Sequence, residues 1–217
     1  MKIYGYKIKN LTIACEISNF TTKILPLLTN LEKLEFHEEI SFDNSRTEEL
    51  SIKLKKLTIS CILDLNKLHI FDIEEFEINF VYFNEEKNVV EFLQKHKNIK
   101  KFKTVDHGDK LDLKNLLKNL KLERLSIYLP YIEGKITANF LKSQKLLKEL
   151  TIYRASIETF NVICRNLENL EKLKIDILDD TTEKDFRKFS KLKKLKILTL
   201  VQIKMTFLNC QKLSLKI

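Results

Sequence analysis

Apolar residues recur along the chain in a short pattern whose first, fourth and sixth places are apolar. The clearest copies are residues 147–152 and 170–175, whose fourth places, Leu150 and Leu173, lie 23 residues apart. Ten copies occur, with fourth places at residues 11, 34, 57, 76, 102, 125, 150, 173, 198 and 213. Seven of the nine steps between them are 23 to 26 residues long. Around the fourth and sixth places, apolar and other residues alternate with the two-residue period of a strand. The sequence therefore predicts a repeat protein with one strand per copy.

The segments between these strands change to helical spacing. The apolar faces expected there are Val89, Val90 and Leu93; Leu113, Leu116, Leu117 and Leu120; Ile136, Phe140 and Leu141; Ile157, Phe160, Ile163 and Leu167; and Phe186, Phe189 and Leu192. Asn84, Ser156 and Thr182 precede three of these faces and are expected to be N-caps, with Asp185 as the acidic third residue of the last helix. The short steps near residues 57–76 and 198–213 leave room for only a loop or a single turn.

A strand motif alternating with helix-sized inserts resembles a leucine-rich repeat solenoid over essentially the whole chain. The resemblance implies an α/β horseshoe with a parallel concave β-sheet and helices on the convex side. It also implies a single domain, residues 1–217, of about ten repeats. The step length is similar to that of the cysteine-containing type. The Asn or Cys usual at the ninth place is missing from all nine copies that have this place, however, and Ala155 occupies it in the copy that begins at Leu147.

Residues 140–152, Phe-Leu-Lys-Ser-Gln-Lys-Leu-Leu-Lys-Glu-Leu-Thr-Ile, resemble repeats of insect F-box proteins, and residues 92–102 are a weaker match. An F-box would open near a Leu-Pro pair and often end near a Trp. Leu25 and Pro26 are followed at once by a repeat strand, and the chain has no Trp, so we identify no F-box in it. The resemblance implies a protein-interaction scaffold. It further implies substrate recognition for a cullin-based ubiquitin ligase, with a cullin ligase adaptor as partner only if an F-box lies outside this chain.

Composition limits the setting in which the protein acts. No run of about 18 apolar residues occurs, so no membrane span is expected. The first residues lack the continuous apolar stretch of a secretory signal. The four cysteines are far apart and form no metal-binding pair, which indicates free thiols in a reducing compartment, the cytoplasm or the nucleus. Because a solenoid with bare ends exposes apolar surface, we also expect flanking segments or an oligomer.

The formal net charge of +9 raises an alternative function, an electrostatic binder of nucleic acid or another polyanion. Only five of the 39 basic residues are Arg, whose bidentate fork suits specific phosphate and base recognition. We therefore interpret the charge mainly as a solvated surface and do not expect a nucleic-acid partner.

The sequence does not indicate an enzyme. The chain has three glycines and none of the glycine-rich phosphate-binding or nucleophile motifs. None of its four histidines lies at metal-ligand spacing from another ligand residue. We therefore expect no catalytic residue, no cofactor and no metal.

The third, fifth and seventh places of each motif should point outward on the concave sheet, where a solenoid binds its partners. Tyr128 and Tyr153 would be neighbours on adjacent strands, and Tyr is a residue type enriched at binding hot spots. Arg124 and Arg154 would flank this pair, with Lys101 and Lys103 one strand away. The six residues form the candidate partner-binding site, suited to an acidic peptide. The alternative is a cross-strand aromatic pair that only stabilises the sheet.

Overall fold

The computed structural model describes residues 7–15, 23–37, 52–60, 65, 70–79, 86–105, 116–128, 134–177, 187–203 and 210–216 of the 217-residue chain. Residues 1–104 and 105–217 form two compact units. Each unit contains a sheet built from the strand repeat. The organisation as one domain of about ten repeats stays a prediction.

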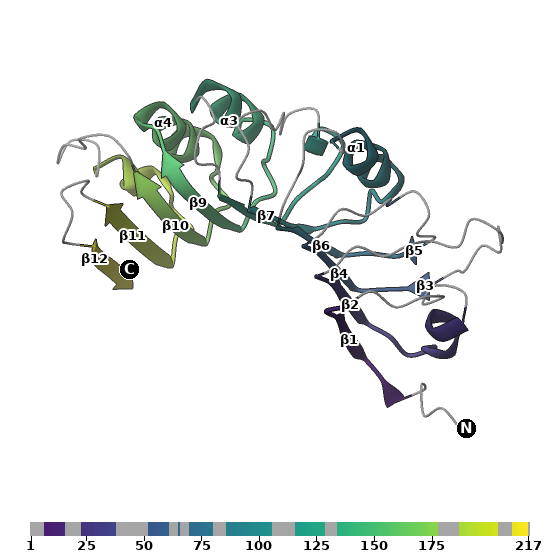
Figure 1. The fold of residues 1–217 in the computed structure, drawn as a ribbon. Coiled ribbons are helices and arrows are strands. Elements are labelled where there is room, and N and C mark those ends of the chain that lie inside the picture. The colour runs from purple at the N-terminus through teal and green to yellow at the C-terminus, as the bar shows by residue number, and fades with distance from the viewer. Residues whose placement is uncertain are drawn as a thin grey trace. The chain divides into compact units, whose positions relative to one another are not determined.

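The sheet of the first unit consists of parallel strands in chain order (Figure 1). They are β1 (Asn10–Ile13), β2 (Lys33–Phe36), β4 (Lys56–Ile59), β6 (Glu75–Ile78) and β7 (Lys101–Val105). The register aligns the fourth places of successive motifs, so that Leu34 lies opposite both Leu11 and Leu57. Phe76 likewise lies opposite Leu57 and Phe102. A separate parallel pair of two-residue strands is formed by β3 (Ile52–Lys53) and β5 (Ile70–Phe71).

The second unit repeats this arrangement with four parallel strands. They are β8 (Arg124–Tyr128), β9 (Glu149–Ala155), β10 (Lys172–Ile177) and β11 (Ile197–Ile203). Leu150 lies opposite Leu125 and Leu173, and Leu173 lies opposite Leu198. The predicted α/β class and the parallel pairing of successive repeat strands are thus confirmed within each unit.

The last copy of the motif departs from the predicted parallel sheet. It forms β12 (Cys210–Lys216), which is antiparallel to β11, with Leu198 opposite Leu215. Only residues 204–209 separate the two strands. A parallel crossover needs about a dozen or more residues, whereas an antiparallel return needs only a short connection. The 15-residue step therefore reverses the strand, and the prediction of a parallel tenth strand is wrong.

The core of each unit lies along the apolar places of the motif. In the second to eighth copies every first, fourth and sixth place is buried. In the first unit, Phe76 packs against Phe92 and Phe102, with ring centroids 5.1 and 6.0 Å apart. Full burial of one such side chain stabilises the fold by about 1.5–3 kcal/mol. The core thins at the end copies, where Ile8 is 36% exposed and Leu200 is half-buried.

Helices connect the strands where the inserts are long enough. They are α1 (Glu86–Lys95) in the first unit, and α3 (Gly134–Leu141) and α4 (Ile157–Asn166) in the second, where α3 and α4 lie on the same side of the strands (Figure 1). Ser156 is the N-cap of α4, as predicted, because its hydroxyl accepts a hydrogen bond from the Thr159 amide at 3.2 Å. Leu25–Pro26 begins the short 3₁₀ helix η3 (Leu25–Leu27), whose N1/N2 proline suits a helix start.

The last predicted helix differs from expectation in its described part. Residues Arg187–Lys191 form a 3₁₀ helix, η6, in which Phe189 is half-buried, although Leu192 just after it is buried as predicted. Phe189 packs edge-on against Phe160 of α4, with centroids 4.9 Å apart. The other predicted helical faces are largely buried as expected, namely at Val89, Leu93, Leu116, Leu117, Leu120, Phe140, Leu141, Phe160, Ile163 and Leu167, whereas Val90 and Ile157 are half-buried. The predictions at Asn84, Leu113, Thr182, Asp185 and Phe186 fall outside the described residues.

One core place is polar. Thr104, the sixth place of the fifth copy, lies opposite Ile78, is completely buried, and its hydroxyl has no hydrogen-bond partner in the described part of the chain. We expect Thr104→Val, which keeps the volume and removes the hydroxyl, to raise the free energy of unfolding by about 1 kcal/mol. Thr104→Ala should lower it by about 1 kcal/mol because it also leaves a cavity. Denaturant unfolding of both variants measures this, and a destabilised Val variant would contradict it.

Candidate partner-binding face

The side chains at the third, fifth and seventh places of the motif form what we call the polar face of each unit. Most of them are half-buried or exposed, because alternation along a strand directs them away from the apolar columns. Two exceptions are Thr58 and Asp176, which are 4% and 2% exposed. The polar face holds five of the six predicted site residues, and Arg154 follows the seventh place of its motif.

Tyr128 and Tyr153 are brought together as predicted. They occupy facing positions of β8 and β9, with ring centroids 5.3 Å apart and ring planes inclined by 59°. Tilted pairs of this kind contribute about 0.5–1.5 kcal/mol beyond the burial of their surface. Both rings stay half-buried, so each keeps surface that a partner could contact.

Lys174, a residue outside the predicted site, completes this cluster from the next strand. Its ammonium donates a hydrogen bond to the Tyr153 hydroxyl at 2.7 Å and lies 5.0 Å from the ring centroid. The nitrogen is much closer to the oxygen than to the centroid, so it lies at the hydroxyl end of the ring and not over its face. Lys174 occupies the fifth place of its motif, so the sequence predicts that it points outward. The sequence pattern did not show that it would contact Tyr153, at the seventh place of the preceding strand.

Arg124 takes part in a short charged row at the third places of the second unit. Its guanidinium lies 3.3 Å from the Glu149 carboxylate, which Lys172 also contacts at 3.0 Å. Arg124 and Lys172 are both half-exposed and share a single carboxylate, so this row keeps an excess of one positive charge. Beyond it, the third place of β11 is Ile197, which is 38% exposed.

Arg154 lies at an irregularity in β9. The register with β10 shifts between Ile175, opposite Ile152, and Ile177, opposite Ala155, so Tyr153 and Arg154 together face Asp176. This is a β-bulge, and the φ of Arg154 is 58°, in the left-handed region that favours glycine. The bulge resets the alternation so that Ala155 is buried at 3% exposure. No Gly or Pro marks the site in the sequence, so the pattern did not predict it.

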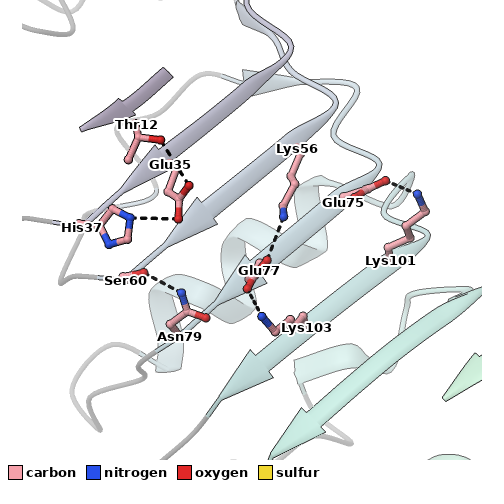
Figure 2. Close-up of polar contacts among 10 residues, drawn as sticks. All are labelled: Thr12, Glu35, His37, Lys56, Ser60, Glu75, Glu77, Asn79, Lys101 and Lys103. Carbon is pink, nitrogen blue, oxygen red and sulfur yellow. Dashed lines mark hydrogen bonds and ion pairs between the residues drawn. The ribbon is translucent and has the colours of Figure 1, made fainter. Parts of the chain in front are cut away.

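Lys101 and Lys103 lie on β7, and both contact carboxylates of the first unit. Lys101 is hydrogen-bonded to Glu75, and Lys103 to Glu77, on the neighbouring strand β6 (Figure 2). Glu77 also accepts a hydrogen bond from Lys56 of β4 at 3.0 Å. The two lysines were expected to add positive charge for a partner. Carboxylates within their own unit instead offset that charge.

The rest of this polar face is also occupied by contacts between strands. Glu35 lies between Thr12, whose hydroxyl is 3.4 Å away, and His37, whose Nε2 is 3.0 Å away (Figure 2). Asn79 donates a hydrogen bond to the Ser60 hydroxyl at 2.7 Å. The polar face of the first unit therefore carries several separate sets of contacts, and its charges largely cancel.

A second electrostatic feature runs along the strand-start edge of each sheet, at the second place of the motif. The residues alternate in sign, as Lys9, Glu32, Lys55, Glu74 and Lys100 in the first unit and as Glu123, Lys148, Glu171 and Lys196 in the second. We call these two rows the edge ladders. The alternation is visible in the sequence, but it becomes meaningful only when the repeats are stacked in register.

Ion pairs connect neighbouring members of the edge ladders. Glu32 lies 3.2 Å from Lys9 and 2.9 Å from Lys55, and hydrogen bonds from Lys55 and then Lys9 hold its pKa below the ordinary value. In the second unit, Glu123 contacts Lys148 at 2.9 Å, and the hydrogen bond from Lys196, 2.8 Å away, lowers the pKa of Glu171. Much of the basic surface is thus neutralised by carboxylates one repeat away.

The potential metal ligands of the described residues do not cluster. Within this part of the chain, no cluster of His, Cys, Asp and Glu could hold a metal ion, and no helix is long and apolar enough to cross a membrane. Cys15 and Cys164 are free thiols, and burial raises the pKa of Cys164 to about 12. His96 packs on Phe92 at 4.2 Å between ring centroids, and burial together with Lys95 lowers its pKa. Packing accounts for Cys164 and His96, whereas Cys15 is exposed.

Comparison with known proteins does not assign the chain to a family. No protein-family model matches it, and no curated protein matches it. What can be said of function therefore depends on the repeat and on the geometry of the two polar faces.

Glu77 generates a prediction about pH. Burial raises its pKa, but hydrogen bonds and charge from Lys103 and Lys56 outweigh this, so its pKa in the folded protein is below the ordinary 4.5. The stability it contributes is full above the unfolded-state pKa and is lost as the pH falls through the folded-state pKa. We expect Glu77→Gln to cost about 1 kcal/mol at pH 7 and to weaken the decline of stability below pH 4.5. Unfolding titrations against pH measure both effects.

The exposed Glu168 supplies the control. Glu168→Gln should change neither the stability at neutral pH nor its acid dependence by much. An unaltered acid profile for Glu77→Gln would show that its two lysine contacts do not stabilise the fold.

The bulge generates a prediction about the backbone. Arg154→Gly and Arg154→Ala both remove the guanidinium, but only glycine relieves the cost of a Cβ at a φ of 58°. We expect the Gly variant to be more stable than the Ala variant by about 1 kcal/mol in denaturant unfolding. In a regular strand the order is reversed, because glycine there is less stable than alanine by about 0.5–1 kcal/mol. The reversed order at residue 154 would mean that the bulge does not form.

Proposed function

We propose that the protein is a leucine-rich-repeat-type interaction scaffold that binds a partner protein on the polar face of β8–β11. The repeat length, the aligned apolar columns and the parallel strands joined through helices support the repeat class. A scaffold of this class provides a broad sheet surface for binding, and its function lies in the side chains on that surface.

The Tyr128–Tyr153 pair is the observation that carries this proposal. Two half-buried tyrosines, 5.3 Å apart between centroids, lie on the same face as the exposed Ile197 and the half-buried Val201. Aromatic and apolar side chains of this kind anchor protein interfaces when a partner covers them. A pair that served only to stabilise the sheet would not require apolar third and seventh places on β11, which lies on the other side of β10 from Tyr153.

Substrate recognition for a cullin-based ubiquitin ligase is the cellular role that we propose for this scaffold. Its support is the resemblance of residues 140–152 to repeats of F-box proteins. In that role the repeats would bind the substrate, and an F-box outside this chain would contact the ligase adaptor.

The alternative function, binding of a polyanion, receives less support. Lys9, Lys55, Lys148 and Lys196 of the edge ladders, and most cations of the polar faces, contact carboxylates. Binding a polyanion would require these pairs to be broken before counterion release could drive association. The net charge of +9 is therefore a poor guide to the local surface.

Site-specific photo-crosslinking tests the proposed binding face. A photoreactive amino acid in place of Thr151, on the polar face between β8 and β10, should capture a protein in the cells that make this chain. The same probe at the exposed Lys142, after α3, should not capture it. Combining the Thr151 probe with Tyr128→Ser and Tyr153→Ser should reduce the adduct at least tenfold.

The outcome separates the candidate functions. An adduct that persists without the two tyrosines, or that forms equally at residue 142, would contradict binding on this face. Co-purification of a cullin adaptor with the adduct would support the ligase role, whereas its absence would leave the scaffold alone. An adduct with nucleic acid that disappears steeply with salt would favour the alternative function.

A further inference from the structure

The contact of Lys174 differs in kind from those of Arg124 and Lys172. Arg124 and Lys172, on the same polar face, both contact the Glu149 carboxylate. Lys174 instead donates to the hydroxyl of Tyr153, a neutral group, at 2.7 Å. In the described part of the chain, no carboxylate contacts the ammonium of Lys174, so its charge remains to be balanced by water or by a ligand.

The hydrogen bond fixes the donors that remain. Because the Tyr153 oxygen accepts from Lys174, its own O–H is directed elsewhere and can donate. The ammonium keeps two further N–H donors. Two donor atoms 2.7 Å apart, one of them charged, can each bind one oxygen of the same carboxylate.

The charge around these donors favours an anion. On β8–β10, four cationic residues, Arg124, Arg154, Lys172 and Lys174, accompany two carboxylates, Glu149 and Asp176, which leaves a formal excess of two positive charges. An acidic ligand would therefore be attracted to this face and oriented on it.

The side chains around Lys174 also indicate which groups of a ligand would lie next to its carboxylate. Thr199 lies opposite Lys174, and Ile197 lies opposite Lys172, so β11 places an apolar side chain beside the charged row. Ile197 is exposed and the Tyr128 ring is half-buried. A ligand whose carboxylate reached Lys174 would place its neighbouring groups over these apolar surfaces.

We infer that Lys174 and Tyr153 form a carboxylate-binding site for an acidic peptide segment of the partner protein, whose adjacent apolar side chains pack on Tyr128 and Ile197. This inference rests on the proposed function, since it names the class of partner for the same face. The carboxylate is that of an Asp or Glu side chain. It accepts one hydrogen bond from the Lys174 ammonium and one from the Tyr153 hydroxyl, and its negative charge balances the positive charge of Lys174.

A library of random dodecapeptides, selected for binding to the full chain, tests the inference whatever the identity of the natural partner. We expect the enriched peptides to combine Asp or Glu with apolar residues. An enriched peptide should bind Lys174→Met about tenfold more weakly than the unaltered chain, and Tyr153→Phe about threefold more weakly, by isothermal titration. The same peptide with Asn or Gln replacing its acidic residues should lose a similar factor on the unaltered chain and little on Lys174→Met.

Lys172→Met is the matched control. It removes the same charge two residues before Lys174, but from a lysine that already contacts the Glu149 carboxylate. It should weaken the peptide by less than threefold. Circular dichroism and unfolding curves of the variants should match those of the unaltered chain, since Lys174 and Lys172 are not in the core.

Four other results would contradict these expectations. Enriched peptides without acidic residues, or equal losses in Lys174→Met and Lys172→Met, would overturn the carboxylate site and leave the binding face intact. Peptides that bind equally well to Tyr128→Ala would overturn the proposed face itself. Failure to enrich any peptide would count against both.

Discussion

Both units depend on one constraint, the parallel register that places each apolar residue of a motif directly beside its equivalent in the next. Leu34 lies between Leu11 and Leu57, and Leu173 lies between Leu150 and Leu198. A slip of one residue would exchange the two faces of a strand and bring lysines and glutamates into the core. The backbone hydrogen bonds and the hydrophobic columns therefore specify the same alignment, and the inserts only have to return the chain to the start of the next strand.

This constraint explains how much of the fold could be predicted. The strand positions, their pairing and the apolar columns follow from a pattern repeated many times, in which a local ambiguity at one copy is resolved by its neighbours. The cap at Ser156 was also predictable, since a short hydroxyl side chain directly precedes a helical face. The reversal of β12 was signalled by the short step, but the motif itself is the same whether the strand runs parallel or antiparallel.

The candidate site was less predictable because it depends on contacts between repeats. Tyr128 and Tyr153 were identifiable since equivalent places become neighbours. The bulge at Arg154 has no local signal, because arginine does not favour a left-handed φ and the strain is imposed by the surrounding strands. Lys101 and Lys103 were assigned to a basic surface by their own charge. Their roles are determined by Glu75 and Glu77, which occupy the same places one repeat earlier.

The two polar faces consequently differ in character although they share a backbone plan. In the first unit, Glu77 joins Lys56 and Lys103, and the contacts of this face leave few charges without a partner of opposite sign. In the second unit, the seventh places of β8 and β9 are tyrosines and the charges do not cancel. A repeat scaffold separates these roles easily, because the outward places can change without altering the inward columns that specify the fold.

The edge ladders have a consequence for how such a chain can change in length. Repeat proteins gain and lose whole units, and the apolar columns alone would accept the removal of any one of them. In the first unit, removing the copy that carries Glu32 would bring Lys9 beside Lys55, so two like charges would replace two ion pairs. Removing two adjacent copies would restore the alternation. Because the charge at the second place alternates from one repeat to the next, the edge ladders favour the gain or loss of repeats in pairs.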